Sequence, residues 1–213
     1  KFHACCRMNH PALDALMALR AEHRFTGEDV ATVHITSIPF GLRMTDAAPG
    51  TMLGAKFSIP YAAAAALVLG RTDTSAFEER MLDDERIRAM AKRIDVAVDD
   101  EMSLKRADYP TAHVRVGLRD GRVLSQTTGV VRGDAANPVS PDEVVEKFLS
   151  LASDPLGRRR AREVIDALDV YRARPMFRGR KSPSDTLGTG LSAAVTEAIE
   201  HGEAPVRQEA IRN

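Results

Sequence analysis

Tryptophan is absent from this chain of 213 residues, aromatic residues make up only 5% of it, and cysteine occurs twice. The two cysteines, Cys5 and Cys6, are adjacent. Neighbouring cysteines rarely reach disulfide geometry, so we expect two reduced thiols. No stretch approaches the roughly 18 apolar residues of a membrane span, and the first residues lack the apolar core of a secretory signal. These absences predict a cytoplasmic protein that does not bind a membrane.

A net charge of either sign is also absent, because thirty basic residues balance thirty acidic ones. The overall charge therefore gives no indication of nucleic acid or an anionic membrane as a partner. Two arginine-rich runs, at residues 158–160 and 178–181, have few aromatic neighbours. We interpret these runs as solvated faces or as contacts with a partner chain, and we expect no nucleic-acid binding.

Signatures of common cofactors are missing as well. The glycines do not have the spacing of a phosphate-binding loop, so no nucleotide cofactor is expected. The Cys5–Cys6 pair has no second cysteine pair, and His3 and His10 do not complete a ligand frame, so no metal site is expected. The sequence predicts chemistry without a cofactor.

Apolar residues make up 44% of the chain, which is enough for a sizeable core. Their spacing predicts an α+β fold with about four strands and packed helices. Residues 39–54, rich in proline and glycine, are expected to form a long loop. The expected elements are helices at 11–23, 58–70, 84–92, 140–152 and 157–168, strands at 30–38 and 94–98, a hairpin over 114–123 with an Asp120-Gly121 turn, and a short helix at 191–199.

Three segments follow from this pattern. Residues 1–138 are expected to form a small α+β domain, and residues 139–172 a pair of helices. The second segment opens with Ser140-Pro141-Asp142-Glu143, the pattern of a capping box with proline at the first helical position. Residues 173–213, rich in Arg, Pro, Ser and Gly over their first half, are expected to be an extended arm or tail with a possible short helix.

Two segments carry the chemistry. Around residues 55–70, Lys56, Ser58 and Tyr61 place a cation, a hydroxyl and a phenol at the start of an alanine-rich helix, which favours an anion-binding corner. The other segment is the opening run KFHACCRMNHPALDA, residues 1–15. Together they resemble the MmgE/PrpD family, over roughly residues 1 to 170. This family includes 2-methylcitrate dehydratases, cis-aconitate decarboxylases and iminodisuccinate epimerases.

The resemblance implies a lid-type domain over residues 1–138 and C-terminal helices that return to an all-helical domain. Family members are about twice as long, so the chain is expected to be a C-terminal half. It would be inactive alone and need the N-terminal helical half, from the same polypeptide or from a partner chain. A homodimer is also implied.

The resemblance further implies three catalytic residues. Lys1 stands where the family has an active-site lysine, His10 where it has a histidine, and Tyr61 where a tyrosine faces the substrate. Lysine balances carboxylate charge, while imidazole and phenol groups handle protons. The alternative roles are structural: a solvated terminal lysine, a helix-capping histidine and an aromatic anchor.

Four further residues are candidates for substrate binding. Arg7 is able to hold a carboxylate by two hydrogen bonds or to pair with a surface aspartate. Lys56 and Ser58 precede the alanine-rich helix, and Cys6 stands where the decarboxylase branch has an active-site histidine. The last difference puts the decarboxylation reaction in doubt.

The predicted function is therefore that of a cofactor-independent hydro-lyase. It would act on a small di- or tricarboxylate such as 2-methylcitrate and remove a proton next to a carboxylate. Epimerisation and decarboxylation are the alternatives within the family. A non-catalytic binding or assembly subunit, which uses the tail to grip a partner, is the alternative outside it.

Overall fold

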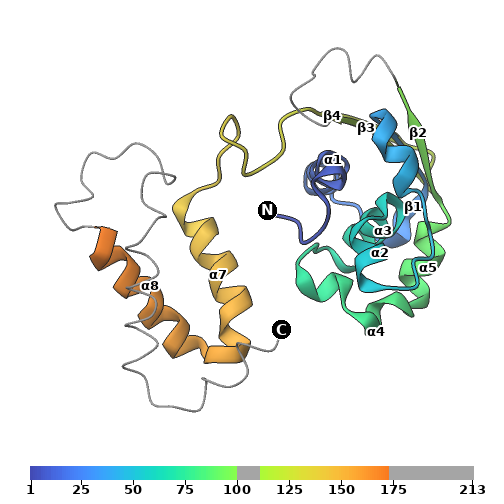
Figure 1. Cartoon of the computed structure of the whole chain (residues 1–213). Helices are drawn as coiled ribbons and strands as arrows, with labels where there is room; N and C mark the ends of the chain where they lie inside the picture. The colour runs from blue at the N-terminus through green and yellow to red at the C-terminus, as the bar shows by residue number, and fades with distance from the viewer. Residues whose placement is uncertain (100–110, 173–213) are drawn as a thin grey trace. The chain divides into compact units, whose positions relative to one another are not determined.

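The computed structural model describes residues 1–99 and 111–172 (Figure 1). The chain divides into two compact units, residues 1–139 and the part from Ser140 onward. Each unit is described by itself. The predicted tail at 173–213 and its helix at 191–199 lie outside the described residues. The assignment of the two units to a lid and to a larger helical domain stays a prediction.

A four-stranded mixed sheet forms the centre of the first unit. Its strands are β1 (Val30–Ser37), β2 (Ile94–Val98), β3 (Ala112–Leu118) and β4 (Val123–Thr128). The order is β2-β1-β3-β4, with β1 parallel to β2 and the other two pairs antiparallel. The predicted strands, the hairpin and the α+β class with four strands are confirmed.

One face of this sheet is buried, and the other is more exposed in the described strands. Val33 and Ile35 of β1 are fully buried, while His34 between them is exposed. Val33 pairs with Ile94 and Val116 on the neighbouring strands, so apolar side chains stand opposite one another. The two-residue period of a strand thus separates a core face from a polar face that contacts solvent.

Helices α1 (His10–His23) and α3 (Ile59–Leu69) cover the buried face (Figure 1). Helix α1 contacts β3 and β4, α3 contacts β2, and the two helices contact each other. The alanines of α3 are buried and allow close approach of its backbone. Arg20 of α1 donates hydrogen bonds to the carbonyl oxygens of Ala66 and Leu67 at 3.0 and 3.2 Å, which satisfies the end of α3.

The crossover from β1 to β2 contains more helix than the sequence predicted. Residues 39–54 were expected to form a loop, but they include η3 (Pro39–Met44) and the start of α2 (Met52–Lys56). Thr51 caps α2, because its hydroxyl accepts a hydrogen bond from the Gly54 amide at 3.0 Å. Elements of five or six residues have too few apolar positions to show a period. The remaining short helices of this unit are η1 (Arg7–Asn9), η2 (Gly27–Asp29), η4 (Thr74–Phe77), α4 (Glu79–Leu82) and α5 (Glu85–Ala91).

The second unit contains the hairpin of α7 (Pro141–Leu156) and α8 (Arg158–Arg172). The capping box is present: the Ser140 hydroxyl accepts from the Glu143 amide at 3.2 Å, and the Glu143 carboxylate accepts from the Ser140 amide at 2.9 Å. Leu149, Ala152 and Ala161 are buried between the helices. None of the helices within residues 1–99 and 111–172 is long and apolar enough to cross a membrane.

Candidate functional site

The two segments that carry the predicted chemistry lie side by side. The Cys6 amide donates to the Lys56 carbonyl oxygen at 2.8 Å. The buried Asn9 side chain donates to the carbonyl oxygens of Lys56 and Ser58 at 3.2 and 3.3 Å. Residues about fifty positions apart are thus joined by backbone contacts, which no side-chain substitution at Lys56 or Ser58 removes directly.

Lys1 and His10 meet at a single carbonyl oxygen. The ammonium nitrogen of Lys1 lies 3.5 Å from the Cys5 carbonyl oxygen, which also accepts a hydrogen bond from the His10 ring. Lys1 is exposed, whereas His10 is only 2% exposed. A cation that reaches solvent and a buried imidazole therefore share one contact point.

The His10 imidazole is neutral at neutral pH. Burial and the neighbouring His3 lower its pKa from 6.5 to about 4. Its Nε2 atom is buried and has no hydrogen-bond partner within residues 1–99 and 111–172, so the proton resides on Nδ1, the nitrogen left to bond the Cys5 carbonyl. His10 in this state is a proton acceptor rather than a donor.

Arg7 points to a carboxylate within the same unit. Its guanidinium forms an ion pair with Asp134, whose side chain is 9% exposed, while the Arg7 side chain is 47% exposed. The neighbouring Cys6 is half-buried. The pairing of Arg7 with an aspartate is therefore present, and its substrate-binding role stays a prediction.

Tyr61 and Ser58 are bound internally. The Tyr61 hydroxyl donates to the Ala76 carbonyl oxygen at 3.2 Å, its ring lies beside Phe77, and burial raises its pKa to about 12. The Ser58 hydroxyl caps α3 by accepting from the Tyr61 amide at 2.9 Å, and it donates to the Asp46 carbonyl oxygen. The start of α3 is thus already capped by a side chain.

Cys5 is a buried thiol. Burial raises its pKa to about 12, so it stays protonated and unreactive at neutral pH. Both cysteines are free. Among the described residues, no group of three His, Cys, Asp or Glu side chains is placed to hold a metal ion.

A buried histidine network beside His10 was not predicted from the sequence. The His3 Nε2 atom lies 2.9 Å from Asp14 Oδ1, and its Nδ1 atom lies 2.5 Å from the Thr72 hydroxyl. The His3 ring meets the His10 ring edge to face, with centroids 4.9 Å apart. One signal was present in the sequence: Asp14 follows His10 by four positions, which places both on one face of α1.

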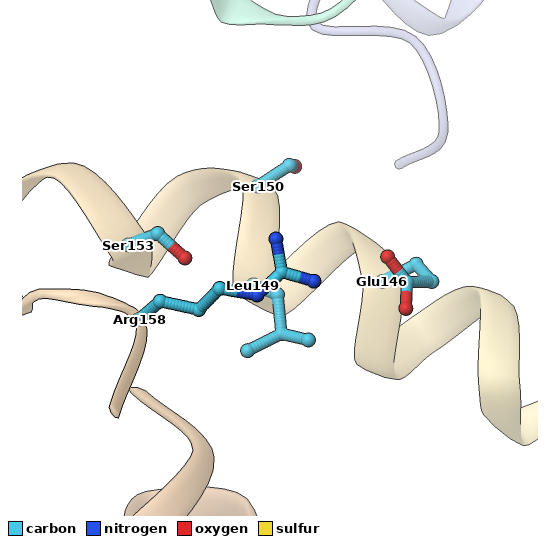
Figure 2. Close-up of a pocket in the computed structure, with 5 residues that line it drawn as sticks. All are labelled: Glu146, Leu149, Ser150, Ser153 and Arg158. Atoms are coloured by element: carbon cyan, nitrogen blue, oxygen red, sulfur yellow. The ribbon is translucent and has the colours of Figure 1, made fainter. Parts of the chain in front are cut away.

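Hollows in the described part of the surface are lined by other residues. One, of about 290 Å³, lies in the helical hairpin and is lined by Glu146, Leu149, Ser150 and Ser153 of α7 and by Arg158 at the start of α8 (Figure 2). The other, of about 490 Å³, is lined by Met17, Arg20, Ala21, Arg24, Phe25 and Gly70. Neither hollow includes a predicted site residue.

The side chains of Lys1, Arg7 and His10 supply groups for carboxylate binding and proton transfer. Two cations on the surface, Lys1 and Arg7, are able to hold a carboxylate. The buried neutral imidazole of His10, which shares the Cys5 carbonyl oxygen with Lys1, is able to accept a proton. A family model, that of the MmgE/PrpD C-terminal domain, matches residues 3–170. No curated protein matches the chain significantly.

Proposed function

Because the chain belongs to the MmgE/PrpD family, as its C-terminal domain, we propose that it is part of a cofactor-independent hydro-lyase. The substrate is a small di- or tricarboxylate with a hydroxyl group, such as 2-methylcitrate. The observation that carries the proposal is the meeting of Lys1 and His10 at the Cys5 carbonyl oxygen. It joins a carboxylate-binding cation to a proton acceptor.

The reaction follows from these groups. Lys1 and Arg7 bind a carboxylate, whose negative charge raises the pKa of the nearby His10. His10 then removes the proton from the carbon next to that carboxylate, while the cations stabilise the enolate-like charge. The hydroxyl group on the adjacent carbon leaves with a proton as water, and a carbon–carbon double bond forms. Tyr61, Cys6, Lys56 and Ser58 remain predicted contributors to substrate binding or proton transfer.

The other family reactions begin from the same groups. Removal of the proton and its return to the opposite face gives an epimer, and loss of carbon dioxide gives a decarboxylated product. Cys6 in place of the decarboxylase histidine disfavours the last reaction. The non-catalytic alternative draws on one observation: the hydroxyl groups of Tyr61 and Ser58 already bind main-chain atoms of the same unit.

The test uses the full chain together with a helical N-terminal half of the family, because the remaining catalytic groups are expected there. Products from a panel of polycarboxylates are identified by NMR in deuterated water. An alkene supports dehydration. Deuterium at the carbon next to the carboxylate without an alkene indicates epimerisation instead, and no turnover with any member of the panel contradicts the proposal.

Variants assign the residues. We expect H10Q to lower kcat by roughly 100-fold or more, since a general base is removed. We expect R7Q to raise KM by roughly tenfold through the loss of a charged contact. H34Q is the matched control, because His34 lies on the exposed face of the sheet beside Asp95, and it should leave both constants within about twofold.

A further inference from the structure

The chain of contacts through His3 crosses three distant parts of the first unit. Thr72, His3 and Asp14 come from a loop after α3, from the opening segment and from α1. The Asp14 carboxylate also accepts a hydrogen bond from the Arg132 amide at 2.8 Å. His3 is therefore bonded through both ring nitrogens, and its ring is unable to rotate without breaking a buried hydrogen bond.

The hydrogen bonds define the protonation states of Asp14 and His3. Burial alone would raise the pKa of Asp14, but the hydrogen bonds from His3 and from the Arg132 amide outweigh that effect and lower it. Asp14 is thus a carboxylate that accepts the proton on His3 Nε2. His3 Nδ1 then carries a lone pair, which accepts the hydroxyl proton of Thr72.

A purely structural role does not require these polar groups. The side chains of His3 and Asp14 are only 10% and 16% exposed, and desolvation of such a pair costs free energy that an apolar ring at position 3 would avoid. What the polar contacts of His3 add is a fixed orientation of its ring. The fixed His3 ring in turn contacts the His10 ring edge to face and so restricts its position.

We propose that His3 is a positioning residue for His10. The Thr72–His3–Asp14 chain fixes the His3 ring, and that ring holds the His10 imidazole with Nδ1 on the Cys5 carbonyl and the Nε2 lone pair uncommitted. The inference deepens the proposed function, on which it rests, because an uncommitted Nε2 atom is the one able to accept the substrate proton. His3 itself does not touch the substrate in this role.

The test measures the tautomer of each imidazole in the full chain by long-range nitrogen–proton NMR. In the native protein we expect a single Nδ1–H form of His10 and an Nε2–H form of His3. H3F keeps the ring shape without its hydrogen bonds, and D14N removes the charge while retaining the size. Both variants should give a mixture of the two His10 tautomers, and T72V should give a smaller change in the same direction.

Stability is measured in parallel by thermal unfolding. A structural role alone would lower the unfolding temperature and leave His10 in its single tautomer. That result in folded H3F or D14N overturns the proposal. D14N serves where H3F does not fold, and H34F is the control for the loss of a histidine ring.

Turnover provides the second measurement. With the helical half present, H3F and D14N should lower kcat roughly 10- to 100-fold with little change in KM, as expected for a misplaced catalytic group. The NMR result does not depend on turnover. If H3F and D14N alter the His10 tautomers but the native chain with the helical half converts no polycarboxylate, the hydro-lyase proposal is refuted. If the native mixture is active but the variants leave the His10 tautomers unaltered, the role of His3 is refuted.

Discussion

The burial of His10 makes the first unit sensitive to acid. This histidine is a base whose pKa falls from 6.5 to about 4 on folding, so the unfolded chain binds more protons between those values. Its contribution to stability is complete above about pH 6.5 and is lost as the pH falls toward 4. A shift of this size corresponds to about 3 kcal/mol.

We therefore expect the native chain to lose about 3 kcal/mol more unfolding free energy than H10Q between pH 7 and pH 4. Urea unfolding at the two pH values measures the difference. The comparison with H10Q removes the contributions of the other titrating groups. Equal losses in the two proteins would mean that folding does not lower the pKa of His10.

The candidate site residues that sequence reasoning named are those that a motif carries, and their roles stay predictions. Lys1, His10 and Arg7 follow from the opening segment, because its residues have a recognisable order along the chain. The partnership of His3 with Thr72 spans 69 positions and has no periodic signal. Sequence reasoning also left the hydroxyl groups of Tyr61 and Ser58 open to a substrate, since it does not reveal which carbonyl groups a fold places beside a side chain.

At the level of elements, helix α3 owes its close packing partly to a glycine. A Cβ atom on Gly27 would lie 2.8 Å from the Leu67 carbonyl oxygen near the end of α3. Arg20 donates hydrogen bonds to this oxygen and to the Ala66 carbonyl oxygen, so the Leu67 oxygen has little freedom to move. The packing of η2 against α3 therefore depends on the absence of a side chain.

We expect G27A to lower the free energy of unfolding by roughly 1–3 kcal/mol, the usual cost of overpacking. G50A is the matched control, because a Cβ atom at that position would meet no heavy atom of the described residues within 4 Å. It should be neutral or slightly stabilising. Denaturant titration of both variants checks the prediction, and equal stabilities would contradict it.

Helix α7 depends on its first residues in a different way. Ser140 and Glu143 exchange hydrogen bonds at the start of the helix. We expect S140A to weaken this end by about 1 kcal/mol, visible as faster amide hydrogen exchange at Glu143 and Val144. S150A is the control, because that serine lies within the helix and donates to the Lys147 carbonyl oxygen instead of capping the helix. Unchanged exchange in S140A would show that the capping box does not limit fraying.

Element predictions succeeded where a period or a cap was long enough to recognise. Val33 and Ile35 alternate with polar residues, and Ser140 to Glu143 form a four-residue signal, so β1 and α7 were both found. Helix α2 depends on the single hydroxyl of Thr51, and η3 on the turn at Pro39, within a segment whose composition favours a loop. Short helices in such segments are decided by tertiary packing.

At the level of the whole molecule, the position of the site residues bears on activity. Lys1 is exposed and Arg7 is half-exposed, so a substrate held by them on this chain would remain in contact with water. Proton abstraction next to a carboxylate requires a site that excludes water and stabilises the developing charge. The helical half of the family is the proposed source of that enclosure.

We accordingly expect the isolated chain to convert no polycarboxylate and a mixture with the helical half to be active. Native mass spectrometry of the chain alone and of the mixture, with turnover measured on the same samples, checks this expectation. H10Q in the mixture controls for assembly, since it should form the complex without activity. Enzyme-like turnover by the 213-residue chain alone would contradict the prediction.

The two faces of the sheet differ in how well they tolerate substitution. Along β1 and β3 the polar face alternates with the core face, so His34 or Arg115 is replaceable without disturbing Val33 or Val116. The opening segment has no such separation. His10 is at once part of the core and the proposed proton acceptor, and the backbone of Cys5 and Cys6 both anchors the segment and belongs to the candidate site. New specificity acquired through residues 1–10 would therefore cost stability, whereas drift on the outer face of the sheet would leave both stability and chemistry unchanged.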